Sequence, residues 1–520
     1  MFRFYAYPSP VIPSPEPRAR ATARTEESPS PLRRPCRRRR ALLALTASAL
    51  TLTGCALQQP YRTPQMPVAA RWHAPTPHHG STQVLVDWWA RFDDPALAQL
   101  IGLAEVDSPT LARAVAQIDT ARATVLASGA SAWPGVTGSA SVTRSNQAGA
   151  IDANSATSGT ATTRKGGLDA SWEIDLFGKA RSSRQSAQAQ LQARVDDWHD
   201  ARVSLAAEVA DDYVQYRACR LLLRSYRDAA ASQEQTVRST RAAVLAGLST
   251  AADGYLAAAS AARAATTAAQ QEAACEGLVK SLVAVTGVEE ATLRAMVDRP
   301  EAPPLPEPGS FQVTSLPADL VRQRPDLASA ERTLAANYAA IGQARADRYP
   351  SFTLSGSISA SPPQLASPGT LWSFGPSLSI PVFDAGEKKA AVDTAVAAYA
   401  LQLATYRSAV RSAVRDVEQA LVELNGAALQ SEQAHRSADQ YRRYATAIET
   451  SWSAGLESLL TLEDARRSAI TAETTLIGLQ RDRVRCWISL YKAVGGGWRV
   501  DGANDPVVAG TTSSSQGVRQ

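Results

Sequence analysis

Residues 352–359 read Phe-Thr-Leu-Ser-Gly-Ser-Ile-Ser, so that apolar or small side chains alternate with hydroxyl side chains. Alternation with a period of two predicts a β-strand that has one apolar and one polar face. The same pattern recurs in residues 136–143, 168–176 and 374–380. These segments approach about ten residues, which is the length that a tilted strand needs to cross a bilayer.

Four strands of this kind cannot close a barrel, and an open strand edge is not tolerated in lipid. The pattern therefore predicts that chains assemble. Three chains of four strands would supply twelve, an even number within the range of bacterial barrels. The alternative is two surface hairpins of a soluble domain. The segregation of Trp, Phe, Leu and Ile on one face from Ser, Thr, Asp and Glu on the other argues against it.

The predicted helices are longer than those of a globular domain. Residues 179–246 contain no proline, and a continuous helix of that length would extend on the order of 100 Å. The turn residues 247–249 predict that the chain reverses there and returns as an Ala-rich helix. Residues 387–451 and 457–494 repeat this arrangement. Such lengths match the depth of a periplasm, and a cytosolic coiled coil is the alternative.

The chain contains one unit twice. Ser108-Pro-Thr-Leu matches Arg324-Pro-Asp-Leu at an offset of 216, and Ala246-Gly-Leu matches Ala454-Gly-Leu at an offset of 208. The change of offset predicts a longer connection in the first copy, the polar stretch 145–167. Landmarks in order at nearly constant spacing indicate an internal repeat. We therefore divide the mature chain into a first repeat (55–300), a second repeat (301–500) and a flexible C-terminal tail (501–520).

The N-terminal segment predicts export. Arg37 to Arg40 precede the apolar run 41–52, and Leu-Thr-Gly leads to Cys55. A basic region, a short apolar region and small residues before the cut are typical of a secretory signal peptide, here residues 1–54. A cysteine directly after Leu-Thr-Gly resembles the bacterial lipobox, whose thiol takes a diacylglycerol. An ordinary signal peptide with a chance cysteine is the alternative, and Ala56 favours the outer membrane as destination.

The positive charge of the chain lies in this removable segment. The formal net charge is +5, and residues 1–54 carry ten Arg and three Glu, which leaves the rest of the chain with the difference of −2. No basic surface for nucleic acid is therefore predicted. Residues 1–36 are rich in Pro, Ser and Arg and exceed a usual basic region, so we expect translation to start near Leu32.

No combination of residues indicates catalysis. His78 and His79 could bind a metal weakly, but their Pro-rich surroundings favour solvated linker residues. No Gly-rich phosphate loop follows a predicted strand, so no nucleotide is expected to bind. The sequence predicts a protein that is not an enzyme, with no cofactor or metal apart from the acyl lipid on Cys55.

Two cysteines lie at matching heights of the first helical hairpin. Cys219 precedes the Gly247 turn by about as many residues as Cys275 follows it, and the periplasm is oxidising. We therefore predict a Cys219–Cys275 disulfide, with two small buried thiols as the alternative. Cys486 has no evident partner.

Several motifs together resemble one family. They are Trp89–Leu100, Ser171–Arg181, the blocks within Leu316–Pro350, Phe374–Gly386 and Leu490–Trp498. The chain resembles the outer-membrane factor family of tripartite efflux systems, of the OprM/NodT lipoprotein type related to TolC. The resemblance covers essentially the whole mature chain. It implies a mostly α-helical, internally duplicated protomer that contributes four strands to a trimeric twelve-stranded transmembrane β-barrel on a long α-helical coiled-coil tunnel. It also implies docking to a periplasmic adaptor protein and an inner-membrane pump of the resistance-nodulation-division (RND) type.

The resemblance places a periplasmic gate at the tips of the helical hairpins. In related channels this tip carries an aromatic residue, a basic residue and acids that face the pore. Trp452 takes the aromatic position and Asp464 that of the last acid, whereas Glu457 stands where TolC has a basic residue and Thr461 where it has an acid. An acid early in a helix also suits the helix dipole. We weigh the two interpretations evenly for Asp464 and favour the helix start for Asp253.

The sequence thus predicts a passive, gated duct that exports small molecules such as drugs or toxic metabolites through the outer membrane, in a homotrimer anchored in outer-membrane lipid. The outer channel of a type I protein secretion system shares the expected fold, but the lipobox and the Gly-Gly-Gly-Trp ending favour efflux. A periplasmic structural lipoprotein without a pore is a further alternative, which the alternating strands disfavour. Nothing in the chain selects the cargo.

Overall fold

The computed structural model describes residues 59–66, 72, 74, 88–92, 94–147, 159–299, 305–306, 323–361 and 369–498. The predicted signal peptide, Cys55, His78, His79 and the predicted tail 501–520 lie outside these residues.

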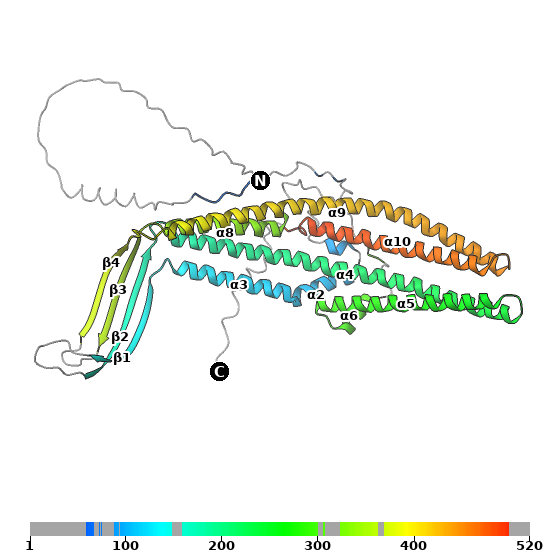
Figure 1. Cartoon of the computed structure of the whole chain (residues 1–520), viewed down its shortest axis with the longest axis horizontal. Helices are drawn as coiled ribbons and strands as arrows, with labels where there is room; N and C mark the ends of the chain where they lie inside the picture. Colours follow the sequence, from blue (N-terminus) through cyan, green and yellow to red (C-terminus); the bar gives the residue numbers. More distant parts are fainter. Residues whose placement is uncertain are drawn as a thin grey trace, which may run out of the picture. The chain divides into compact units, whose positions relative to one another are not determined.

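The described chain contains the same unit twice (Figure 1). The first copy consists of α3 (Pro109–Ala130), β1 (Gly135–Gln147), β2 (Gly159–Ile174), α4 (Lys179–Leu245) and α5 (Ala251–Thr286). The second copy consists of α8 (Pro325–Ala346), β3 (Ser351–Ser361), β4 (Gly369–Ser379), α9 (Glu387–Ser453) and α10 (Leu459–Ala493). The long helices α4 and α9 have 67 residues each. The predicted duplication is confirmed.

The four strands form one antiparallel sheet in the order β1-β2-β3-β4. Directly opposed residues of a ladder share a face, and Ile358 stands opposite Leu168 on one side and Trp372 on the other. Ser357 stands opposite Asp169 and Ser373 in the same way. The predicted apolar and polar faces are therefore confirmed, with Leu371 as an apolar exception opposite Ser359. Many large side chains of the apolar face are exposed in the single chain: Val136, Val142, Leu168, Ile358, Trp372, Phe374 and Leu378.

The strands are longer than the pattern predicted, and the expected connection 145–167 is wrong in part. β1 continues to Gln147, and β2 already begins at Gly159, where it pairs with Gln147. Threonines 160, 162 and 163 favour extended backbone, and the ladder supplies hydrogen bonds whether or not the side chains alternate in polarity. β4 ends at Ser379, so Ile380, the last residue of the predicted strand, lies just beyond the observed strand.

The outer strands of the sheet each have a single partner within the described chain. β1 pairs only with β2, and β4 pairs only with β3. A strand edge of this length exposes a row of unpaired backbone N–H and C=O groups. Both edges of the sheet can therefore pair with further strands.

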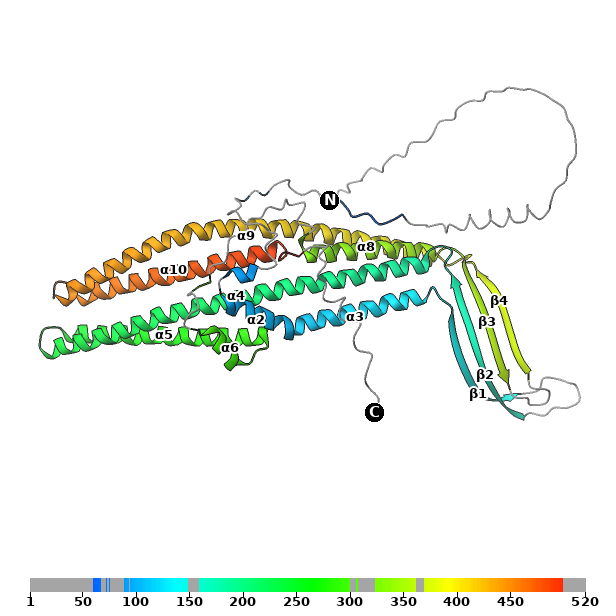
Figure 2. The ribbon, with the colours of Figure 1, turned by 180° about the vertical axis from the view of Figure 1, so that it is seen from behind.

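Two helical hairpins extend from the sheet, α4 with α5 and α9 with α10 (Figure 2). Among the described residues, no helix is both long and apolar enough to cross a membrane. The main core lies midway along these helices, where η2 (Trp88–Phe92), α2 (Pro95–Asp107) and α6 (Glu290–Val297) pack against them. Trp88 is almost fully buried there and stacks on Tyr491 with ring centroids 5.0 Å apart.

Within the second copy, the start of α8 contacts the end of α10. The Arg324 guanidinium donates to the Ala493 carbonyl oxygen at 3.0 Å and pairs with Asp326 at 2.7 Å. A cation at a helix C-terminus satisfies a free carbonyl and suits the helix dipole. Gly495 follows in the left-handed region at φ +85°, and an added Cβ would lie 2.0 Å from the Gln323 carbonyl oxygen. Only glycine fits this position.

Candidate functional site at the hairpin tips

Both hairpins reverse through the same turn. Gly247 and Gly455 have φ values of +73° and +77°, and each follows the last residue of a long helix by two positions. The next amide, of Leu248 or Leu456, donates to the carbonyl five residues back at 2.8 or 2.9 Å. This is a Schellman ending, in which glycine takes the left-handed position. The matching turns explain why the two tips were recognisable as repeats.

Asp253 caps the helix that follows the first tip. Its carboxylate accepts hydrogen bonds from the Thr250 amide at 3.0 Å and from the Thr250 and Ser249 hydroxyls, while Thr250 accepts from the Asp253 amide. These bonds, the one from the Thr250 hydroxyl above all, hold the pKa of Asp253 below its usual value. The arrangement is a capping box. It agrees with the helix-start interpretation favoured for this residue.

Trp452 lies half-buried at the second tip and joins the two hairpins. It packs against a small apolar cluster whose buried members are Ala257, Leu459 and Leu462. Ala257 belongs to α5, so the cluster against which the indole ring packs includes residues of both hairpins. Glu457 is exposed in the turn between α9 and α10. The structure therefore places the aromatic residue in a packing contact and Glu457 in solvent.

Asp464 projects from the first turns of α10 into solvent. Its side chain is 68% exposed and pairs with Arg467 at 2.5 Å, three residues further along the same helix. Neither Asp253 nor Asp464 contacts the other hairpin through a described hydrogen bond or ion pair. The four tip residues singled out in the sequence are thus not brought together in one protomer.

Residues on either side of Asp464 in α10 make polar contacts with the other hairpin. Gln233 of α4 donates to Glu463 of α10 at 2.7 Å, and Arg466 donates to Thr236 at 2.6 Å. Arg466 also pairs with Glu449 of α9 at 2.5 Å. The Arg466 and Glu463 side chains are 14% and 10% exposed. We call these five residues the inter-hairpin cluster. Sequence reasoning missed it, and the available signal was a pair of charged residues on an otherwise apolar helix face.

The inter-hairpin cluster is incompletely satisfied. The Gln233 Oε1 and Glu463 Oε1 atoms are buried, and neither has a hydrogen-bond partner among the described residues. A buried polar atom without a partner costs about 1–3 kcal/mol. The Glu463 carboxylate is nevertheless within 3.8 Å of the Arg466 guanidinium. The contact between the hairpins is therefore specific in its partners but modest in net strength.

Further along the same two helices, the Arg485 guanidinium of α10 donates to Asp211 of α4 at 2.6 and 3.2 Å. The neighbouring Asp212 has no such partner described. Burial raises the pKa of Asp212 to about 6, and the charges of Asp211 and Glu208 add to this while Arg485 opposes it.

This shift predicts a pH dependence of stability. Because the native pKa exceeds the usual value of 3.8, the folded state binds the Asp212 proton more tightly than the unfolded chain. The contribution of Asp212 to the free energy of unfolding should therefore be greatest below about pH 4 and should fall as the pH rises through about 6. Asp212→Asn should raise the melting temperature at pH 7.5 more than at pH 4.5. Asp211→Asn, which removes the Arg485 partner, should lower the melting temperature at pH 7.5. The same sign for both variants would contradict this account.

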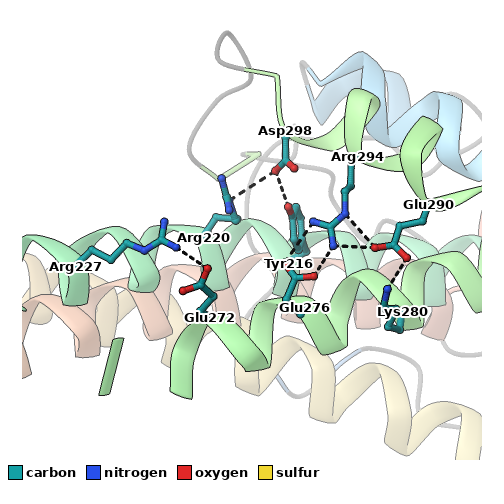
Figure 3. Close-up of polar contacts among 9 residues, drawn as sticks. All are labelled: Tyr216, Arg220, Arg227, Glu272, Glu276, Lys280, Glu290, Arg294 and Asp298. Carbon is teal, nitrogen blue, oxygen red and sulfur yellow. Dashed lines mark hydrogen bonds and ion pairs between the residues drawn. The ribbon is translucent and has the colours of Figure 1, made fainter. Parts of the chain in front are cut away.

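A covalent and ionic brace lies at the middle of the first hairpin. Cys219 and Cys275 are joined, with Cα atoms 5.6 Å apart. Beside them, Figure 3 shows Arg294 of α6 reaching Glu276 of α5 and Glu290 of its own helix, while the Tyr216 hydroxyl donates to Asp298. These contacts hold α6 against α4 and α5. Counting from the second tip, the equivalent positions in the second hairpin carry Ala427 and Arg483, so the disulfide belongs to the first copy alone.

Removing the disulfide should destabilise the protein. The two cysteines are 56 residues apart, and a crosslink over that distance is worth about 4 kcal/mol through the unfolded chain. The Cys219→Ala/Cys275→Ala variant should therefore unfold at a clearly lower denaturant concentration, whereas Cys486→Ala should change it little. Peptide mapping without reductant should recover the linked peptides. Two free thiols in protein taken from the periplasm would contradict the pairing.

The model of the outer membrane efflux protein family matches residues 100–288 and 316–496, which is more than half of the chain. The chain belongs to the outer membrane efflux protein family. Proteins of this family are components of transport systems, and the family is not a family of enzymes.

The matches with relatives of this efflux protein extend over most of the chain. The probable efflux pump outer membrane protein TtgC of Pseudomonas putida is 29% identical over 477 residues, which are 88% of this chain and 96% of TtgC. Nodulation protein T of Rhizobium leguminosarum bv. trifolii is 30% identical over 470 residues, 86% of this chain and 96% of its own. The outer-membrane channel OprN superposes with a TM-score of 0.74 at 27% identity, over 85% of this chain and all of OprN.

These likenesses establish the fold and the role. The efflux protein has the duplicated, mostly helical TolC-like fold with four strands per chain. It is the outer-membrane channel component of a tripartite efflux system. Among the described residues, no group of three or more His, Cys, Asp or Glu side chains could hold a metal ion.

Proposed function

We propose that this efflux protein is one protomer of a homotrimer whose three sheets close a twelve-stranded barrel in the outer membrane. The sheet carries the proposal, because it combines a continuous exposed apolar face with an open edge on each side. Such a sheet is unstable in water and, alone, in lipid. Closure with two further copies pairs both edges and leaves the apolar faces to the bilayer. The Ser- and Thr-rich faces then line the passage.

The helices continue this passage through the periplasm towards an adaptor protein and an inner-membrane pump of the RND type. In this proposal the duct itself is passive and the pump drives export. Small molecules such as drugs or toxic metabolites are the proposed cargo class. The pump and adaptor select the cargo.

The gate lies near the tips of the hairpins, where the passage narrows. The apolar cluster of Ala257, Leu459 and Leu462 and the inter-hairpin cluster join the two hairpins of one protomer. Moving the two hairpins apart would widen the passage. Opening therefore requires breaking contacts of modest strength. Binding energy from an adaptor that prefers the separated hairpins can supply it.

Acylation of Cys55 anchors the protomer in outer-membrane lipid. Support comes from the Leu-Thr-Gly-Cys sequence after a basic and an apolar segment. Cells fed a labelled fatty acid should yield a labelled protein, and Cys55→Ser should remove the label. Because the sheet itself would insert in the membrane, the variant should keep some membrane attachment. A labelled Cys55→Ser protein would contradict the anchor assignment.

Asp464 is proposed to face the passage near the gate. Three exposed carboxylates around a threefold axis attract cations, so Asp464→Ala should reduce cation selectivity and raise single-channel conductance in planar bilayers. Asp119→Ala is the matched control. Asp119 also pairs with an arginine three residues on, Arg122 at 3.0 Å, but lies on α3. Equal selectivity in wild type and both variants would remove Asp464 from the constriction.

A further inference from the structure

The contact between the two copies inside one chain is a template for a contact between chains. β2 of the first copy pairs with β3 of the second, and Ile174 stands opposite Phe352 in this ladder. Just beyond the ladder, three residues further along each line, the Phe177 and Tyr349 rings stack with centroids 4.8 Å apart. An aromatic pair therefore fastens the first copy to the second where the sheet meets the helices.

The same two aromatic positions recur at the outer edges of the sheet. Tyr349 matches Trp133 at the offset of 216, and each is followed by proline. Phe177 ends the run Ile-Asp-Leu-Phe, and Phe383 ends the run Ile-Pro-Val-Phe. Trp133 precedes β1 and Phe383 follows β4, the two edge strands in Figure 1, and these side chains are 75% and 90% exposed. The stack formed within the chain thus has two separate, exposed halves at its edges.

The helices lack a partner in the same place. α8 packs against α9 of its own copy and α4 of the other, whereas α3 packs chiefly against α4 among the described elements. The Ser186 hydroxyl of α4 donates to the carbonyl oxygen of the buried Ala336 of α8 at 3.0 Å, but the α3 counterpart of Ala336, Thr120, is exposed. On α9, Leu401 is exposed, whereas its α4 counterpart at the offset of 208, Ala193, is buried. A neighbour equivalent to the other copy is therefore missing.

Lipid is the alternative partner, because exposed Trp and Phe rings are enriched at the interfaces of a bilayer. Leu401 argues against lipid as the only partner. It lies 14 residues after the start of α9 at Glu387, which places it about 20 Å along the helix. The polar layer of one leaflet is only about 5–8 Å thick, so lipid does not reach this far. A second copy of the chain covers the rings and the helix positions in one contact.

We propose that Phe383 of each protomer stacks on Trp133 of the next protomer, and that α9 of the first packs against α3 of the second. This inference rests on the proposed trimer and specifies the residues that join its chains. Counted back by the same three residues as in the template, Ile380 then stands opposite Val136, so the apolar face continues from sheet to sheet. A head-to-tail contact of this kind closes a ring when the rotation between copies allows it.

The first test crosslinks the two positions in full-length protein in isolated membranes. Trp133→Cys/Phe383→Cys, made with Cys486→Ala to remove the free thiol among the described residues, is treated with a short bismaleimide and run on a denaturing gel. Covalent trimers should form, with dimers at shorter times, and either new cysteine alone should leave monomers. Phe177→Cys/Tyr349→Cys is the matched control, because this pair should crosslink within one chain and leave monomers.

The second test follows dissociation of the detergent-solubilised trimer by native mass spectrometry. Trp133→Ala and Phe383→Ala should each speed dissociation roughly tenfold, because each removes the aromatic pair. The double variant should dissociate little faster than either single variant, since both substitutions remove the same contact. Leu168→Ala is the control. Leu168 lies on the same apolar face but on the central strand β2, so its loss should leave the rate nearly unchanged.

Other results overturn the proposal. Protein with the native mass of a trimer that yields only monomers after crosslinking would exclude the contact and leave the trimer intact. Dimers from either single cysteine variant would show that like positions meet instead. Rate effects of the two alanine variants that multiply in the double variant would place the rings at independent sites, as expected for rings in lipid. A monomeric native mass is a separate result, which contradicts the proposed trimer itself.

Discussion

Gly495→Ala is expected to lower the free energy of unfolding by roughly 3 kcal/mol or more, through left-handed strain and overpacking. The new Cβ would lie 2.0 Å from the Gln323 carbonyl oxygen and 3.0 Å from the Arg324 Cα. Both are backbone atoms, so relief requires that the start of α8 move away from the end of α10. That movement would also separate Arg324 from the Ala493 carbonyl.

Gly478→Ala provides the matched control for this prediction. Gly478 lies within α10, and an added Cβ would meet nothing within 4 Å. Alanine in a helix is favoured over glycine by about 1 kcal/mol, so this variant should be as stable as the wild type or more so. Guanidinium unfolding of the three proteins gives the comparison. A Gly495→Ala protein as stable as Gly478→Ala would show that the close approach is not maintained in solution.

Arg466→Met should open the gate. The substitution removes the donor to Thr236 and the partner of Glu449, and it leaves Glu463 nearly buried without its cation. Loss of a charged hydrogen bond costs about 2 kcal/mol, which corresponds to about a 30-fold change in the ratio of open to closed protomers. Higher mean conductance and a larger open fraction in planar bilayers should follow.

Arg467→Met separates a specific contact from a general loss of charge. Arg467 is the next residue, but it is 59% exposed and pairs only within α10 according to the described contacts. It should change the open fraction far less than Arg466→Met. Equal effects of the two variants would assign the change to net charge at the tip. No effect of either would place the gate elsewhere.

Features that depend on local pattern were predictable. The period of two along residues 352–359 specified a strand and its faces, because successive side chains must point to opposite sides. The absence of proline over residues 179–246 and the glycine after them predicted a helix and its end. Counting residues from the turn brought Cys219 and Cys275 to the same height, because two antiparallel helices rise equally per residue.

Features that depend on the register between distant helices were not predictable. Gln233 and Glu463 are 230 residues apart in sequence. Which turn of α4 faces which turn of α10 depends on the packing of all the side chains between them. The resemblance to a known gate directed attention to Asp464, whereas its neighbours Glu463 and Arg466 make the described inter-hairpin bonds. The pairing of Asp464 with Arg467 is, by contrast, a local feature, because residues three apart on a helix are neighbours on its surface.

Single-channel recording from the purified full-length protein tests the central claim most directly. Protein shown by its mass to be a trimer, and shown by flotation to be inserted in lipid vesicles, should produce discrete current steps in a planar bilayer without added nucleotide or a proton gradient. The current should be carried at either polarity, because the duct itself is passive. An inserted trimer that produces no current steps, even with Arg466→Met, would contradict the account.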